Sequence, residues 1–115
     1  GVQGAAPFYL NIGTTDVHQN VWNKGNQNGR MALYGGPIRD DEIEIPPFLP
    51  DTPAIREMMA RFGASIRWLD AQCARLFGAI QKLGLDRNTL VLFTTDHGIA
   101  GMRAKGTLYD AGLET

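Results

Sequence analysis

Residues 88–98 read NTLVLFTTDHG, and this stretch decides the fold of the chain. Residues 88–95 are β-branched or apolar almost throughout, and they end at the polar pair Asp96 and His97. An apolar run without alternation is typical of a strand that is covered on both faces, as in a parallel sheet. Residues 7–14, PFYLNIGT, form a second short apolar run without a helical period, so they predict another buried strand.

A long amphipathic helix is predicted between the two runs, over residues 53–83. Thr52 can cap its start, Pro53 suits the first helical position, and Gly84 supplies a stop. Gly63 is the position at which a bend or break is expected. The apolar residues recur every three or four positions and form a single stripe: Ile55, Met58, Met59, Phe62, Ile66, Leu69, Cys73, Leu76, Phe77, Ile80 and Leu83. Strand, helix and strand in this order predict a right-handed βαβ crossover, the unit of a parallel α/β sheet.

The composition limits the function classes. The chain has 115 residues with 11 Lys and Arg against 12 Asp and Glu, so it lacks the basic excess of proteins that bind nucleic acid through bulk charge. No apolar run approaches the roughly 18 residues that a membrane span requires.

Cys73 is the only cysteine, which excludes an internal disulfide, and its place in the apolar stripe predicts a buried structural thiol. Residues 15–52 are predicted to be a loop, and a connection of this length is typical of a functional segment such as an active-site wall.

The residues after the predicted strands are the candidates for chemistry. Ligands of α/β sheets bind beyond the carboxyl ends of the strands, so Asp96 and His97 are expected where a metal or an anion would be held. Gly98 permits the sharp turn that lets both side chains reach one cation. The alternative is a loop-capping aspartate beside a hydrogen-bonded histidine. His18 lies four residues past the first strand and is expected at the same sheet edge, in a functional or a structural role.

Two cations follow the Asp-His pair. Arg103 and Lys105 lie among small residues, so their long side chains can fold back over the metal position and contact an anionic substrate. Two solvated loop cations are the alternative interpretation. Asp40 and Asp41 form a carboxylate pair, but no apolar strand precedes them to place them at a sheet edge. A solvated acidic turn is therefore favoured over a metal site.

In their order and spacing, the sequence motifs of this chain resemble those of the type I sulfatases of the alkaline-phosphatase superfamily, especially the heparan N-sulfatase-like and bacterial polysaccharide sulfatase branches. The resemblance implies an α/β fold in which the chain is a βαβ segment of an alkaline-phosphatase-like parallel-sheet sandwich. Residues 1–115 would then be part of the catalytic domain, with residues 96–112 as the active-site loop. The motifs that carry it extend over nearly the whole chain: residues 7–13 leading to His18, 45–53, 65–70, 83–85, 88–91, 93–98 and 105–109.

Residue by residue, the resemblance implies that Asp96 is a ligand of the active-site divalent cation, usually Ca²⁺, and that His97 is its neighbour in the metal site. Many members have Asn where His97 stands, and imidazole suits transition metals better than Ca²⁺, so both metal types remain open. Lys105 matches the basic residue that contacts the sulfate group. His18 matches a histidine that contacts the sulfate or the leaving-group oxygen, so His18 and Lys105 are the catalytic candidates.

Two features of the family are absent from the sequence. The family nucleophile is a formylglycine made in a Cys/Ser-x-Pro-x-Arg motif, whereas Cys73 is followed by Ala-Arg-Leu, and the Asp-Asp metal pair of an N-terminal strand is missing too. We therefore expect an internal fragment of a sulfuric ester or sulfamate hydrolase, inactive alone, with the formylglycine in an upstream region. Its substrate would be a sulfated small molecule or glycan, and its location that of the family, which is mostly periplasmic, secreted or lysosomal. The alternatives are a phosphoryl or phosphonate monoester hydrolase of the same superfamily and a non-catalytic, self-associating module.

Overall fold

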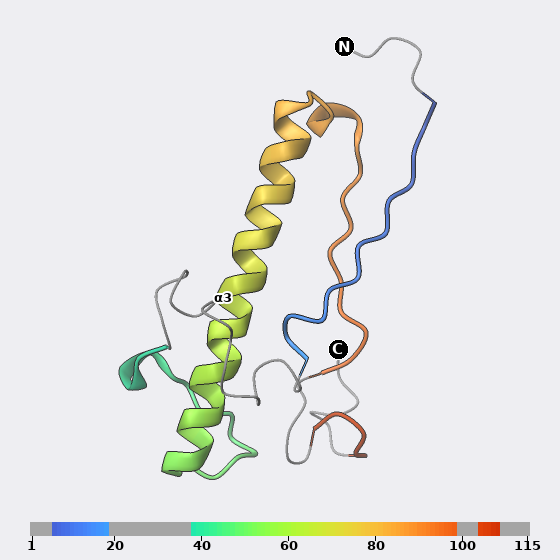
Figure 1. Ribbon diagram of the computed structural model, residues 1–115. Helices are drawn as coiled ribbons and strands as arrows, with labels where there is room; N and C mark the ends of the chain where they lie inside the picture. Colours follow the sequence, from blue (N-terminus) through green and yellow to red (C-terminus); the bar gives the residue numbers. More distant parts are fainter. Residues whose placement is uncertain (1–5, 19–37, 99–103, 109–115) are drawn as a thin grey trace.

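The structure is a computed structural model, and it describes residues 6–18, 38–98 and 104–108. The helix α3 (Pro53–Lys82) is flanked by two short 3-10 helices, η1 (Asp40–Glu42) and η2 (Asp86–Asn88). Two extended segments, residues 6–18 and 89–98, both run in the direction opposite to α3 (Figure 1). Within the described ranges, no helix combines the length and the apolarity that a bilayer-spanning segment requires.

Local signals set the two ends of α3. The Thr52 hydroxyl accepts a hydrogen bond from the backbone N–H of Ile55 at 3.3 Å, which satisfies one of the free donors of the first turn. At the other end, Gly84 has a φ of 67°, and the N–H groups of Gly84 and Leu85 donate to carbonyl oxygens of the last turn. This is the paired hydrogen-bond pattern of a glycine-terminated helix. Because Leu83 is the C-cap, α3 ends one residue before the predicted range does.

Gly63 serves close packing and does not bend the helix. α3 continues through this position, so the expected break is wrong. A Cβ atom at Gly63 would overlap the Cδ1 atom of Ile38, from the segment that precedes α3. The same segment is held further along, where the Arg67 guanidinium donates to both carboxylate oxygens of Glu42 at 3.2 Å. The absence of a side chain at Gly63 therefore lets residues 38–49 lie directly on the first half of α3.

We expect Gly63→Ala to stabilise the chain only when Ile38 is shortened. Alanine is more favourable than glycine inside a helix by about 1 kcal/mol, but in the native background the new methyl group displaces Ile38 and loses that gain. Urea unfolding followed by circular dichroism would be measured for Gly63→Ala, Ile38→Ala and the double variant. Gly78→Ala is the matched control, because nothing lies within 4 Å of its Cβ position and it should gain the full amount in both backgrounds. An equal gain for Gly63→Ala in both backgrounds would show that the contact is absent.

The two predicted strands are not formed in the part of the chain that the structure describes, which corrects the expectation for residues 7–14 and 88–95. Both segments are extended, and their apolar side chains are exposed, up to 83% for Leu90 and 89% for Tyr9. A strand of a parallel sheet takes hydrogen bonds from neighbours on both sides and is covered by helices on both faces. A single helix and two segments do not supply those neighbours. The two extended segments nevertheless run in the same direction, as the strands of a βαβ crossover do (Figure 1).

The core lies around the first half of α3. Ile55, Ala60 and Ala64 are buried there, together with Leu49 from the preceding segment. Cys73, predicted to be buried, is half-buried in the second half of the helix and carries a free thiol. The two halves of α3 therefore differ: the first is covered on more than one face, and the second is more open.

Candidate functional site

Asp96 and His97 hold an oxygen and a ring nitrogen close together at the end of the second extended segment. The Nδ1 atom of His97 lies 2.9 Å from the carbonyl oxygen of Gly98. Because a carbonyl oxygen can only accept, Nδ1 carries the proton, and in the neutral ring this leaves the lone pair on Nε2. That Nε2 atom lies 3.4 Å from Oδ2 of Asp96. The side chains are 86% exposed for Asp96 and 37% for His97, so both donor atoms are within reach of a dissolved ion.

The local backbone explains this arrangement. The Thr95 hydroxyl donates to the carbonyl oxygen of His97 at 2.9 Å and closes a tight bend after the extended segment. Metal bonds of about 2.0–2.6 Å place two adjacent ligands roughly 3 Å apart, close to the observed separation of the Asp96 and His97 donors. Among the described residues, however, no group of three or more His, Cys, Asp and Glu is gathered for a metal ion. Two donors alone do not make such a group among the residues that the structure describes.

His18 ends the other extended segment, on a turn of its own. Its backbone N–H donates to the carbonyl oxygen of Thr15 at 3.0 Å, and the Thr14 hydroxyl donates to Oδ2 of Asp16 at 2.7 Å. The side chain of His18 is exposed. In Figure 1, residues 6–18 and 89–98 both end in the half of the molecule that holds the start of α3. The structure thus brings these two ends to one half of the molecule but does not place His18 in a metal-binding group with Asp96 and His97.

Lys105 lies on a closed turn. The backbone N–H and the hydroxyl of Thr107 both donate to the carbonyl oxygen of Ala104, at 3.0 and 2.6 Å, and Gly106 adopts a φ of 79°. Ala104 is completely buried, whereas the Lys105 side chain is exposed. The turn therefore exposes the Lys105 ammonium group, while the buried Ala104 fixes the backbone on one side of it. Arg103, the other predicted substrate-binding cation, lies outside the described residues.

Ion pairs dominate the segment around the first half of α3, and sequence patterns did not reveal most of them. The backbone N–H of Arg39 lowers the pKa of the Glu42 carboxyl, and the Arg67 guanidinium adds to this effect. The hydrogen bonds from Arg56 to Asp51, both 2.7 Å long, lower the pKa of the Asp51 carboxyl. Asp41 is exposed and pairs with Arg39 at 2.9 Å, which agrees with a solvated acidic turn. The sequence signal for the pairs near η1 is the acidic run Asp40, Asp41 and Glu42.

The chain is similar to sulfatases from several sources. It is 30% identical over 106 residues to the ulvan-active sulfatase of Formosa agariphila, and the matched region covers 90% of this chain and 18% of that protein. It is 38% identical over 137 residues to human arylsulfatase A, covering 96% of this chain and 27% of the relative. Human N-sulphoglucosamine sulphohydrolase is 25% identical over 124 residues, with 96% of this chain and 25% of the relative covered. The chain thus spans between about a fifth and a quarter of these relatives, and no solved structure matches it.

A family-wide comparison gives the broadest result. The profile described as Sulfatase matches residues 2–114, which is nearly the whole chain. That family has an alkaline-phosphatase-like α/β fold, in agreement with the order of extended segment, helix and extended segment along this chain. The match includes the His18 turn, the Asp96 and His97 pair and the Lys105 turn. The chain therefore belongs to the sulfatase family.

Proposed function

We propose that this chain forms part of the active site of a sulfuric ester or sulfamate hydrolase, to which it supplies a cation-binding pair and a sulfate-binding lysine. The single observation that carries the proposal is the convergence of Asp96 Oδ2 and His97 Nε2, 3.4 Å apart, with the ring proton held on Nδ1 by a carbonyl oxygen. This hydrogen bond orients the imidazole as a ligand, as second partners of metal-bound histidines do. Membership in the sulfatase family supports a sulfated substrate.

The donor set fits a divalent cation. Sulfatases typically use Ca²⁺, and the Asp96 carboxylate is a ligand that Ca²⁺ prefers. The His97 imidazole is more typical of transition-metal sites, so a softer divalent ion also suits the pair. When bound, the cation would supply positive charge to the sulfate oxygens. The remaining ligands would come from outside the described residues.

The cationic side chain of Lys105 is proposed to hold the sulfate group. A lysine ammonium offers three donors and a full positive charge, which compensates the negative charge of the sulfate oxygens. His18 is proposed to donate a proton or a hydrogen bond to the leaving-group oxygen, a role that histidine side chains commonly take in general acid catalysis. Arg103 is proposed as a further contact to the substrate.

We expect the 115-residue chain to bind an aryl sulfate without hydrolysing it, because it carries no Cys/Ser-x-Pro-x-Arg motif from which formylglycine could form. Binding should require a divalent cation and should weaken at least about fivefold in Lys105→Gln, which loses one exposed charge contact. Arg87→Gln removes an exposed cation elsewhere and is the matched control. NMR titration with and without EDTA would measure binding, and released sulfate would measure turnover. Cation-independent binding, or appreciable turnover by the purified chain, would contradict the proposal.

A further inference from the structure

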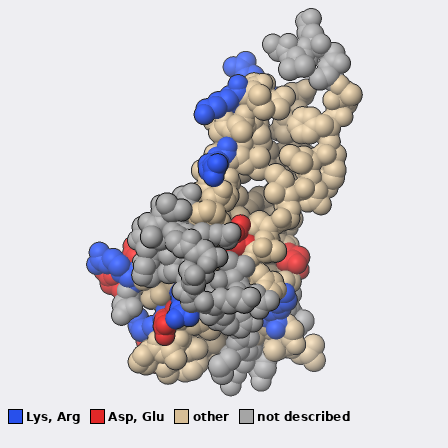
Figure 2. Space-filling model, viewed as in Figure 1, with Lys and Arg blue, Asp and Glu red and all other residues tan. Residues whose placement is uncertain are grey.

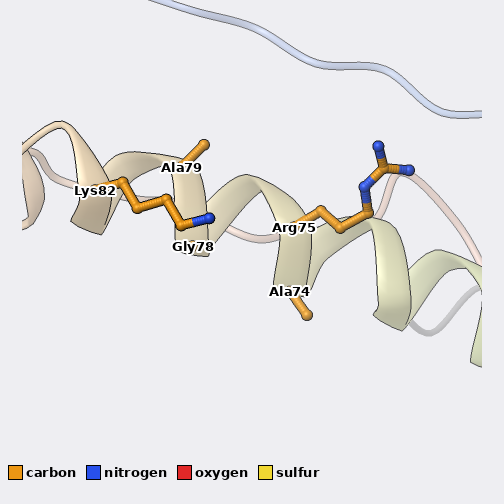
Figure 3. A pocket seen from close by; sticks show the side chains of 5 residues that line it. All are labelled: Ala74, Arg75, Gly78, Ala79 and Lys82. Carbon is orange, nitrogen blue, oxygen red and sulfur yellow. The ribbon is translucent and has the colours of Figure 1, made fainter.

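The exposed basic side chains on the second half of α3 do not converge on one point. A shallow depression on one face of the helix is lined by Ala74, Arg75, Gly78, Ala79 and Lys82. The Arg75 side chain points away from Gly78 and Lys82, so the two cations do not face a shared ligand position (Figure 3). Figure 2 shows basic side chains along one edge of the upper part of the molecule, with no acidic atoms in view beside them. Polar groups do converge at the end of the second extended segment, around Asp96 and His97.

Two hydrogen bonds between side chains and backbone enclose this pair. The Thr95 hydroxyl donates to the carbonyl oxygen of His97 at 2.9 Å, and Nδ1 of His97 donates to the carbonyl oxygen of Gly98 at 2.9 Å. The first bond restrains the peptide unit that joins His97 to Gly98. The second holds the ring against the next carbonyl group along the chain. Because glycine has more backbone freedom than any other residue, the position of the Gly98 carbonyl depends on what restrains the peptide unit before it.

The bend at residues 95–98 is closed differently from the other two turns that carry candidate residues. In the turns of His18 and Lys105, a backbone N–H donates to the carbonyl oxygen three residues earlier, at 3.0 Å in both. Within the described residues, no hydrogen bond between backbone groups closes the bend at residues 95–98. The Thr95 hydroxyl spans this bend instead. A single side-chain substitution can therefore release the bend, whereas the two other turns keep their backbone bonds whatever the side chains are.

We infer that Thr95 is a positioning residue, whose hydroxyl holds the bend in which His97 keeps its ring proton on Nδ1 and turns Nε2 toward Asp96. Thr95 acts through the peptide unit after His97 and contacts neither a cation nor a sulfate group. When the bend is released, the ring loses its carbonyl partner, and the proton distributes between both nitrogens as in a free neutral imidazole. A proton on Nε2 removes the lone pair that a cation would need. The consequence for cation binding rests on the proposed function, whereas the effect on the ring does not.

The test measures the tautomer of His97 by ¹⁵N NMR in the full 115-residue chain, with EDTA present and at a pH where both histidines are neutral. We expect the ratio of the Nδ1–H to the Nε2–H tautomer to fall about fivefold in Thr95→Val, which keeps the shape of the side chain but loses one hydrogen bond. Thr95→Ser retains the hydroxyl and should keep the native ratio. Thr94→Val is the matched control, because the Thr94 hydroxyl donates to the carbonyl oxygen of Thr95 at 3.3 Å and does not span the bend. That variant should stay within about twofold of the native ratio.

Three results would overturn the inference: a native chain without an excess of the Nδ1–H tautomer, an unchanged ratio in Thr95→Val, or equal shifts in Thr94→Val and Thr95→Val. Titration of the same variants with Zn²⁺, after the EDTA is removed, separates this role from the proposed function. We expect Thr95→Val to bind Zn²⁺ about fivefold more weakly than the native chain and Thr95→Ser to match it. Absence of cation binding by the native chain, with the tautomer shift intact, would refute the proposed function alone. Cation binding that requires Asp96, with the tautomer ratio unaffected by Thr95→Val, would refute the positioning role alone.

Discussion

Replacing Asp96 with alanine is expected to abolish measurable divalent-cation binding by the chain. Asp96 supplies the only carboxylate that lies beside the His97 ring at 3.4 Å among the ion pairs of the described residues. Removing an outer partner of a metal ligand lowers affinity about 10–100-fold, so removal of a ligand itself should cost at least that much. Calorimetric titration with Ca²⁺, Mn²⁺ and Zn²⁺ would measure the loss and would also identify the preferred ion.

Asp86→Ala is the control for this experiment. Asp86 is also an exposed aspartate, ten positions earlier in the chain and on η2. Its removal changes the net charge by the same amount and should leave the cation affinity unchanged. Equal affinities for Asp96→Ala and the native chain would remove Asp96 from the proposed site. Equal losses in both variants would show that binding follows net charge alone.

The second large effect is expected in self-association. The chain exposes apolar side chains along both extended segments, with Leu90 at 83% and Leu92 at 81%. Burying an exposed leucine contributes about 1.5 kcal/mol or more, and extended backbone with free hydrogen-bonding groups readily pairs with another chain. We therefore expect oligomers at high concentration, and we expect Leu90→Lys/Leu92→Lys to weaken association by about two orders of magnitude. Light scattering over a concentration series would measure this.

Leu108→Lys is the matched control for association. Leu108 is 91% exposed, yet it lies on the Lys105 turn, outside the two extended segments. Its replacement should leave the oligomeric state nearly unchanged. A native chain that stays monomeric at high concentration would refute the prediction. Equal effects of Leu108→Lys and the double variant would show that association does not use residues 88–95.

The sequence predicted α3 well because the signals for a helix are local. The apolar period, the Thr52 cap and the Gly84 stop act within a few residues of one another, and α3 follows them closely. Local rules do not reveal the role of Gly63, because it depends on Ile38, which lies 25 positions away. The pair of Arg67 and Glu42 was missed for the same reason.

The extended segments show a second limit. The composition of residues 88–95 favours a strand, but a strand exists only when a neighbour supplies its hydrogen bonds, and that depends on residues distant in the chain.

The residues of the candidate site differ in how well the sequence alone predicts them. Asp96 and His97 were predictable as a pair because they are adjacent and follow an apolar run, whereas the tautomer set by Gly98 needed the structure. The roles of His18 and Lys105 stay predictions from family resemblance, and that of Arg103 stays a prediction from its place in the loop.

We propose that Asp96 and His97 of this sulfatase-family chain bind one divalent cation. The chain has only two histidines, so ¹⁵N NMR of the imidazole nitrogens during a Ca²⁺ or Zn²⁺ titration tests this claim directly. We predict that the Nε2 resonance of His97 moves with saturation while Nδ1 stays protonated, and that both responses vanish in Asp96→Ala. A His97 ring that is unaffected by either cation, or that responds identically in Asp96→Ala, would contradict the claim.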